Sequence, residues 1–211
     1  MQKIYNKLRN DITFGKFKPG EHLSEKFLVQ EYGVSRASIR GIIGQLATQG
    51  YLTIEPNRGA TVTKLSLDDI DIIYNILMRC ESYATALFTC QQNQANIRKL
   101  QSLQKRMDAK GVAAEYERWL QLNEQFHRQV YNNCGSDIVS NLIDHTRLRI
   151  YRFRVIETTP DIINRYNSQH KEILQAIFEG NERSAEKLMS DHLDTARKHR
   201  FEVFKAFHEL L

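Results

Sequence analysis

The 211-residue chain has few cysteines, prolines and glycines, and it has no long apolar run. The three cysteines are odd in number, widely spaced and free of any CxxC pair, so we interpret them as ordinary thiols in a reducing cytoplasm. No uncharged apolar stretch approaches the roughly 20 residues that a membrane helix requires, and no signal peptide is visible. We therefore expect a cytoplasmic protein with no membrane partner.

Glycine and proline are scarcest in the second part of the chain, where only three glycines and Pro160 follow residue 66. Each of them falls between helical patterns, and the segment Ser66–Asp69 has the composition of a helix-starting capping box. This scarcity predicts an all-helical bundle. The expected helices cover residues 67–90, 93–110, 112–132, 136–156, 160–179 and 181–209.

Charge is distributed unevenly along the sequence. Residues 1–66 hold 10 Lys and Arg against 5 Asp and Glu, whereas residues 67–211 hold 20 of each, so the whole net charge of +5 belongs to the first segment. A basic module joined to a neutral one is the balance expected when the first part faces nucleic acid phosphates.

The run from Leu23 to Arg40 predicts two helices joined by a tight turn. Gly33 can take a positive φ without a Cβ clash and can end the first helix, and Ser35 is a preferred N-cap for the second. Apolar residues of the second helix recur at inward spacing, while Arg36 and Arg40 share the opposite face. In helix-turn-helix proteins these first turns meet base edges in the major groove, so this pair is predicted to contact double-stranded DNA.

A small β hairpin is predicted after the second helix. Tyr51–Ile54 and Ala60–Thr63 are rich in β-branched residues, and the turn between them carries Arg58 at its tip and Gly59 at a position suited to positive φ. A basic tip suits a phosphate or the minor groove. Each arginine alone is explained equally well by a solvated face, and it is the order of helix, turn, helix and hairpin that favours DNA binding.

The first 66 residues resemble the winged helix-turn-helix domain of GntR-type bacterial transcription regulators. The matching motifs include Leu23-Ser24-Glu25, Gly33-Val34-Ser35-Arg36 and Asn57-Arg58-Gly59. Ala37-Ser38 and Gly41 depart from the family pattern, which leaves the operator preference open. The resemblance implies DNA contacts by Lys26, Ser35, Arg36, Ser38, Arg40, Arg58 and Gly59.

Three histidines lie on apolar faces of three predicted helices. His127 follows Asn123 by four residues, so both project from one side of a helix, and His170 and His192 belong to two later helices. Three imidazoles and an amide oxygen from three helices can converge inside a bundle, where imidazole suits zinc, nickel, copper, iron or manganese. On spacing alone, hydrogen-bonded core histidines are the alternative.

Residues 70–205 resemble the FCD effector-binding domain of the FadR-like branch of the same family. The resemblance rests on Asn123-Glu124-Gln125-Phe126-His127, on the segment that begins at His170, and on Met189 to Leu193. It implies that Asn123, His127, His170 and His192 bind a divalent metal ion, namely zinc, nickel or manganese. Asparagine stands where aspartate is commoner, which removes one negative charge and weakens the expected affinity.

Domains of this type bind a small organic acid beside the metal, with arginines gripping the carboxylate. Arg149 lies on a line with Ile138, Leu142 and His145 that we expect to face the bundle interior, so Arg149 and His145 are the predicted effector-binding residues. A basic solvent face is the alternative. Leu77 stands where the family often has arginine, so one effector contact is missing or displaced.

The sequence therefore predicts a mainly α protein. Residues 1–66 form a winged helix-turn-helix domain with a small β-hairpin wing, and residues 67–211 form an all-helical FCD-type domain that binds ligand and metal and dimerises. The predicted homodimer binds a roughly palindromic DNA operator under control of a small-molecule effector, a carboxylate. Two alternatives stay open: a regulator whose effector is the metal ion itself, and a helical metalloenzyme with a basic tether. Glu124 and Asp191 are helical neighbours of metal ligands and point away from them, so no catalytic residue is predicted.

Overall fold

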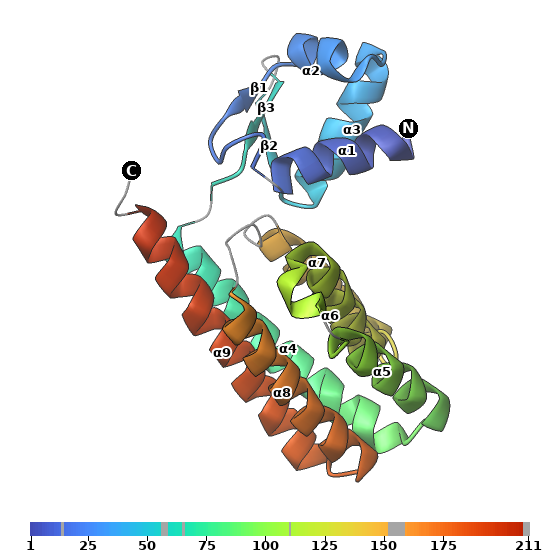
Figure 1. The fold of residues 1–211 in the computed structure, drawn as a ribbon. Coiled ribbons are helices and arrows are strands. Elements are labelled where there is room, and N and C mark those ends of the chain that lie inside the picture. Colours follow the sequence, from blue (N-terminus) through green and yellow to red (C-terminus); the bar gives the residue numbers. More distant parts are fainter. Residues whose placement is uncertain (14, 56–58, 65, 110, 152–158, 209–211) are drawn as a thin grey trace. The chain divides into compact units, whose positions relative to one another are not determined.

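The computed structural model describes residues 1–13, 15–55, 59–64, 66–109, 111–151 and 159–208 (Figure 1). Contacts within the chain define two compact units, residues 1–73 with 145–156 and residues 74–144 with 157–211. The expected boundary at residue 66 differs from this division at the first turns of one helix and at residues 145–156. The protein is mostly helical with one small antiparallel sheet among the described residues, which confirms the predicted fold class.

The described residues up to 64 form three helices and a three-stranded sheet in the amino-terminal unit. The strand order is β1-β3-β2, and both pairings are antiparallel. Pattern reasoning found β2 and β3 to within one residue but missed the first helix and β1. The elements are α1 (Gln2–Thr13), β1 (His22–Leu23), α2 (Glu25–Tyr32), α3 (Arg36–Thr48), β2 (Leu52–Glu55) and β3 (Gly59–Val62).

Local capping explains where α2 and α3 begin and end. Gly33 has φ +64° and closes α2, as predicted, with its N–H donating to the carbonyl of Val29. Ser35 caps α3 because its hydroxyl accepts the N–H of Ser38 at 3.2 Å. The inner face of α3 is buried against the core of this unit, which fixes the outer face toward solvent. Its buried residues are Ile39, Ile42, Ile43 and Leu46.

The second part of the chain consists of helices. α8 packs along α9, and α5 packs against α6 and α8 (Figure 1). None of the described helices has the length and apolarity needed to cross a membrane. The elements are α4 (Leu67–Gln91), α5 (Gln94–Met107), a short 3-10 turn (Val112–Ala114), α6 (Tyr116–Tyr131), α7 (Asp137–Tyr151), α8 (Pro160–Phe178) and α9 (Glu182–His208).

Most of the predicted helix ends in this part agree with the structure to within one residue. The main difference lies between α5 and α6, where the helix expected over residues 112–132 begins only at Tyr116, after the 3-10 turn. The predicted end at residue 156 lies outside the described residues. Gly111 introduces the 3-10 turn at φ +90°, a left-handed conformation that interrupts the helical pattern.

The helix ends follow from cap residues that the sequence displays. Ser66 and Asp69 form the reciprocal capping box of α4, in which each backbone N–H donates to the other side chain at 2.9 to 3.0 Å. Thr159 caps α8 with Pro160 in the first turn. Gly180, at φ +70°, follows α8, and Asn181 accepts the N–H of Ser184 at the start of α9. These predictions are confirmed.

Candidate functional site

Two groups of residues have the chemistry of a functional site, one on each unit. The first is the outer face of α3. Arg36 and Arg40 project from its first two turns with side chains 71% and 63% exposed, so their guanidinium groups are accessible to a large polyanion. The buried residues of α3 lie on its opposite side, so the face that carries the two arginines is not part of the core of the unit.

Glu25 in the first turn of α2 joins the two arginines. Its Oε2 accepts a hydrogen bond from Arg36 Nε at 2.6 Å, and its Oε1 accepts one from Arg40 Nε at 2.7 Å. Hydrogen bonds from Arg40 and then Arg36 hold the pKa of the Glu25 carboxyl below its ordinary value. Each bond uses one of the five N–H donors of its guanidinium, so other donors of both arginines remain for a second partner. Glu25 belongs to a motif matched above, but this contact between two helices was not predicted.

The other predicted DNA-binding residues border the same face or the sheet. Lys26 is exposed on α2 beside Glu25, and the hydroxyls of Ser35 and Ser38 lie 2.9 Å apart at the start of α3. Gly59 opens β3 with φ +113°, and a Cβ at this position would lie 2.5 Å from the carbonyl oxygen of Leu23 in β1. The sheet therefore requires glycine here for packing reasons alone. Arg58 lies outside the described residues.

The second group is a cluster of three imidazoles in the helical unit. His127 of α6, His170 of α8 and His192 of α9 are each at most 3% exposed, and one ring nitrogen of each lies within 4.8 Å of the others. The Nε2 atoms of His170 and His192 are 3.1 Å apart. The structure thus brings together the three histidines that were predicted to converge.

Neighbouring side chains hold each ring in place. Phe126 stacks on His170 with ring centroids 4.3 Å apart. Glu81 of α4, 2% exposed, has Oε2 2.9 Å from His127 Nδ1, and Gln169 of α8 has Oε1 3.1 Å from His192 Nδ1. Contacts of this kind orient an imidazole and select which nitrogen carries the proton.

Asn123 is the fourth predicted metal ligand and lies one turn before His127 on the same face of α6. Its Oδ1 is shielded from solvent and accepts no hydrogen bond from any described residue. A buried amide oxygen without a donor is costly, about 1 to 3 kcal/mol, and a cation removes that cost. The donor set of three imidazole nitrogens and one amide oxygen therefore fits a divalent transition metal.

An aromatic group with a buried guanidinium adjoins the histidines. Tyr166 of α8 packs edge-on against His192 with centroids 5.5 Å apart and stacks on Trp119 at 5.9 Å. Arg200 of α9, 9% exposed, donates to the Tyr116 hydroxyl at 3.2 Å. The Tyr166 hydroxyl is buried and has no hydrogen-bond partner among the described residues. Burial raises the pKa of Tyr166 far above its ordinary value, although the nearby charge of Arg200 lowers it.

The effector residues expected on α7 are placed differently. Ile138 is 83% exposed and Leu142 is 49% exposed, so the prediction that this line faces the bundle interior is wrong. The helix buries its other side, which includes Ile143. His145 and Arg149 are both exposed, and neither belongs to the histidine cluster. Their role in effector binding stays a prediction, but the inward orientation on which that prediction was based is not observed.

Sequence reasoning missed the residues that support the histidines. Glu81 carried a readable signal, because it interrupts the buried stripe of Leu77, Ala84 and Phe88 on α4. A carboxylate on an apolar stripe indicates a buried polar partner. Gln169 carried no comparable signal, since an amide on a helix flank is common and its partners belong to another helix.

A winged helix-turn-helix unit with exposed arginines, joined to a helical unit, defines a DNA-binding transcription regulator. The chain belongs to the gntR family of bacterial regulatory proteins, whose pattern matches residues 1–62, and an FCD domain matches residues 72–195. It is similar to the uncharacterized HTH-type transcriptional regulator YdhC of Bacillus subtilis, at 28% identity over 93% of this chain and 89% of that protein. It is also similar to the HTH-type transcriptional repressor RspR of Escherichia coli, at 24% identity over 91% and 85%.

Solved structures show the same fold. The structure of E. coli McbR/YncC matches with a TM-score of 0.81 at 18% identity, covering 96% of this chain and 97% of that chain. A GntR regulator from Rhodococcus sp. RHA1 matches with a TM-score of 0.74 at 22% identity, covering 94% and 96%. The names of YdhC and RspR are those of transcription regulators, in keeping with a protein that is not an enzyme.

Proposed function

We propose that this regulator binds its operator as a homodimer and that a small carboxylate, held beside a divalent metal in the helical unit, controls operator affinity. The observation that carries the proposal is the convergence of His127, His170 and His192 within 4.8 Å at full burial. Each neutral imidazole offers one nitrogen lone pair, and three lone pairs at this spacing suit a shared transition-metal ion.

Zinc, nickel and manganese are the candidate ions, to be held by the three histidines and Asn123 Oδ1. A divalent ion in this position supplies a positive charge for an anionic ligand, while the protein positions that ligand. An amide in place of a carboxylate ligand leaves the site one negative charge poorer. The site therefore favours an anionic ligand that restores the balance.

Next to His192, the side chains of Tyr166 and Arg200 can contact the part of the carboxylate ligand that the metal does not hold. Arg200 provides a buried positive charge, and Tyr166 provides a hydroxyl that no described residue engages. A carboxylate accepts hydrogen bonds from both group types, and charge-assisted bonds of this kind are the strong ones. This assignment replaces the exposed Arg149 and His145 as our first candidates for effector contact.

Two-fold symmetry is the argument for the homodimer. A dimer places two copies of α3 on two half-sites of a palindromic operator, and two arginine pairs double the contact that one copy makes. A ligand in the helical unit then acts by changing the free energy of the DNA-bound arrangement.

The first test measures operator affinity by fluorescence anisotropy for Arg36→Ala and Arg40→Ala, with the similarly exposed Arg118→Ala of α6 as a matched loss of charge. We expect each α3 variant to lose about 1 to 3 kcal/mol of operator-binding free energy. Arg118→Ala should bind the operator as tightly as wild type. Equal affinity for all four proteins contradicts the assignment of α3.

The second test measures the metal content of the purified protein and its thermal shift with carboxylates from acetate to citrate. Wild type should retain metal and shift with at least one acid, and His170→Ala should do neither. If zinc alone changes operator affinity and no acid shifts the protein, the ion itself is the effector. A metal-free wild type that cannot be loaded with zinc, nickel or manganese refutes the metal part of the proposal.

A further inference from the structure

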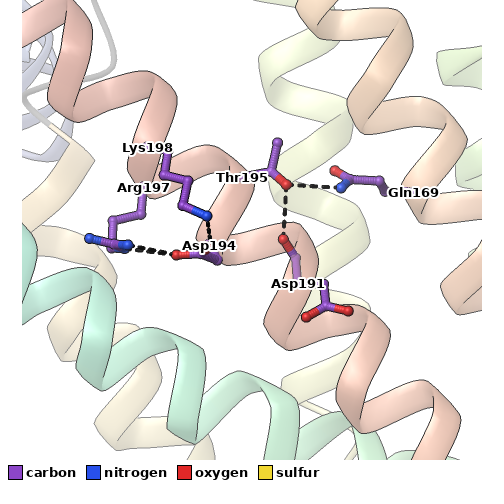
Figure 2. Close-up of polar contacts among 6 residues, drawn as sticks. All are labelled: Gln169, Asp191, Asp194, Thr195, Arg197 and Lys198. Atoms are coloured by element: carbon purple, nitrogen blue, oxygen red, sulfur yellow. Dashed lines mark hydrogen bonds and ion pairs between the residues drawn. The ribbon is translucent and has the colours of Figure 1, made fainter.

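A chain of three hydrogen bonds runs from His192 to the backbone of α9. His192 Nδ1 lies 3.1 Å from Gln169 Oε1, Gln169 Nε2 lies 3.0 Å from Thr195 Oγ1, and Thr195 Oγ1 lies 2.9 Å from the carbonyl oxygen of Asp191. Figure 2 shows the last two bonds, with Gln169 reaching Thr195 across the two helices. This chain crosses the contact between α8 and α9, the helices that carry two of the three histidines.

The backbone carbonyl of Asp191 determines which group donates in each of these three hydrogen bonds. A backbone carbonyl can only accept, so the Thr195 hydroxyl donates its proton to the oxygen of Asp191. The Thr195 oxygen then accepts from the amide nitrogen of Gln169, which turns Oε1 toward His192. Because Oε1 has no proton to give, His192 must donate from Nδ1.

The tautomer of His192 is therefore set by residues outside the cluster. With the proton on Nδ1, the neutral ring has a lone pair on Nε2, the atom that faces His170 Nε2 at 3.1 Å. Glu81 imposes the same arrangement on His127, whose Nδ1 lies 2.9 Å from the buried carboxylate. In their neutral forms the rings of His127 and His192 thus each carry a lone pair on Nε2, and a cation needs such a lone pair from every imidazole that binds it.

We propose that Gln169 and Thr195 are positioning residues that hold His192 as the Nδ1–H tautomer and so prepare its Nε2 for a divalent metal. The effect on metal binding rests on the proposed metal site, whereas the tautomer of His192 is a property of the metal-free protein. Gln169 differs from Glu81 in kind, since an amide fixes the ring's orientation without adding a negative charge. Partners of this type commonly change metal affinity 10- to 100-fold.

The test compares side chains that keep or break the chain of bonds. Gln169→Leu removes the acceptor for His192, and Thr195→Val removes the hydroxyl that orients the amide. Thr195→Ser retains that hydroxyl and serves as the conservative rescue.

Asp194→Asn is the matched control. Asp194 pairs with Arg197 at 2.8 Å and with Lys198 at 2.7 Å, one residue away from Thr195 but outside the chain of bonds (Figure 2). Because Asp194→Asn weakens these ion pairs and leaves the hydrogen-bond chain intact, it measures any general effect of disturbing this turn of α9.

The first readout is the tautomer of His192 in the metal-free, full-length protein, from two-dimensional ¹H–¹⁵N spectra of the histidine side chains. Wild type, Thr195→Ser and Asp194→Asn should show the proton on Nδ1. Gln169→Leu and Thr195→Val should show a mixture of tautomers or the proton on Nε2. An unchanged Nδ1–H signal in both of these variants overturns the inference.

The second readout is zinc affinity by competition with a chromophoric chelator. Gln169→Leu and Thr195→Val should bind zinc about 10- to 100-fold more weakly than wild type, and the serine variant and the Asp194 control within about twofold. Zinc affinity that is unchanged in Gln169→Leu and Thr195→Val also overturns the inference. Failure of wild type itself to bind zinc refutes the proposed metal function instead, while the tautomer measurement still decides the role of Gln169.

Discussion

Glu25 shows how one acidic residue can improve a DNA-binding surface. Its carboxylate accepts Nε of both α3 arginines, so it fixes two long side chains that otherwise lose rotamer freedom on binding. The same negative charge opposes attraction to any phosphate nearby. We therefore expect Glu25 to increase selectivity for the operator over random DNA while lowering the total affinity for DNA.

Glu25→Gln should consequently have opposite effects on two kinds of DNA. Affinity for random-sequence DNA should rise because a negative charge is lost, and the ratio of operator to random affinity should fall by about tenfold, roughly the value of one base contact. Anisotropy titrations at two salt concentrations measure both. Glu31→Gln is the control, since Glu31 lies on the same helix and pairs with Lys16 instead. A ratio that falls equally in both variants argues against the positioning role.

Tyr166 gives a second prediction for a single residue. Its buried hydroxyl has no partner among the described residues, so Tyr166→Phe should leave the ligand-free protein as stable as wild type or stabilise it by about 1 kcal/mol. Tyr131→Phe should destabilise, because the Tyr131 hydroxyl donates to Asp144 at 2.7 Å. Calorimetry measures both. If the hydroxyl contacts an effector, Tyr166→Phe also loses the thermal shift with the carboxylate that stabilises wild type, whereas a retained shift removes Tyr166 from the effector site.

Among the secondary-structure elements, backbone geometry separates glycines that look alike in the sequence. Gly44 lies inside α3, and a Cβ added there would have no atom within 4 Å beyond its own neighbours in the helix, whereas Gly33 closes α2 at φ +64°. A methyl group favours the helical conformation in the first case and opposes the left-handed one in the second.

We expect Gly44→Ala to stabilise the protein by about 0.5 to 1 kcal/mol and Gly33→Ala to destabilise it by about 1 kcal/mol. Scanning calorimetry of the full chain measures the two shifts side by side. The same sign for both variants contradicts this explanation, since neither position offers a new contact to the methyl group.

Gly59 carries the prediction for the sheet. Gly59→Ala combines φ +113° with a Cβ 2.5 Å from the Leu23 carbonyl, so β1 and β3 must separate and stability should fall by about 1 to 3 kcal/mol. Loss of operator binding is expected to accompany the loss of stability. Unchanged stability with reduced operator affinity indicates a direct contact between Gly59 and DNA.

In the molecule as a whole, the two parts of the chain differ in net charge. The excess of basic residues lies in residues 1–66, and residues 67–211 are balanced. The net positive charge that attracts phosphate thus belongs to the first part of the chain. Any control of DNA binding by ligand must pass through a shift in the population of DNA-competent arrangements.

Linkage makes this control measurable. If zinc changes operator affinity by some factor, operator DNA must change zinc affinity by the same factor, which for coupled sites is commonly about 5- to 150-fold. Anisotropy with and without zinc gives one factor, and chelator competition with and without operator gives the other. A change on one side only contradicts coupling between the sites. His170→Ala, which removes one of the proposed zinc ligands, is the control that should abolish both changes.

The local features of this protein could be predicted from its residues alone. Helix starts such as Ser35 and Thr159 and stops such as Gly33 and Gly180 were predictable, because capping and positive φ depend on residues within a few positions of one another. Apolar spacing likewise placed the three clustered histidines on inward faces.

Other features depend on tertiary packing and could not be read from the sequence. They include the choice of His127 as the partner of Glu81, the contact of Gln169 with His192, the addition of β1 to the sheet, and the exposure of Ile138 and Leu142. Each of these features joins residues far apart along the chain or depends on what a helix face meets. Helical periodicity defines a face without specifying what packs against it.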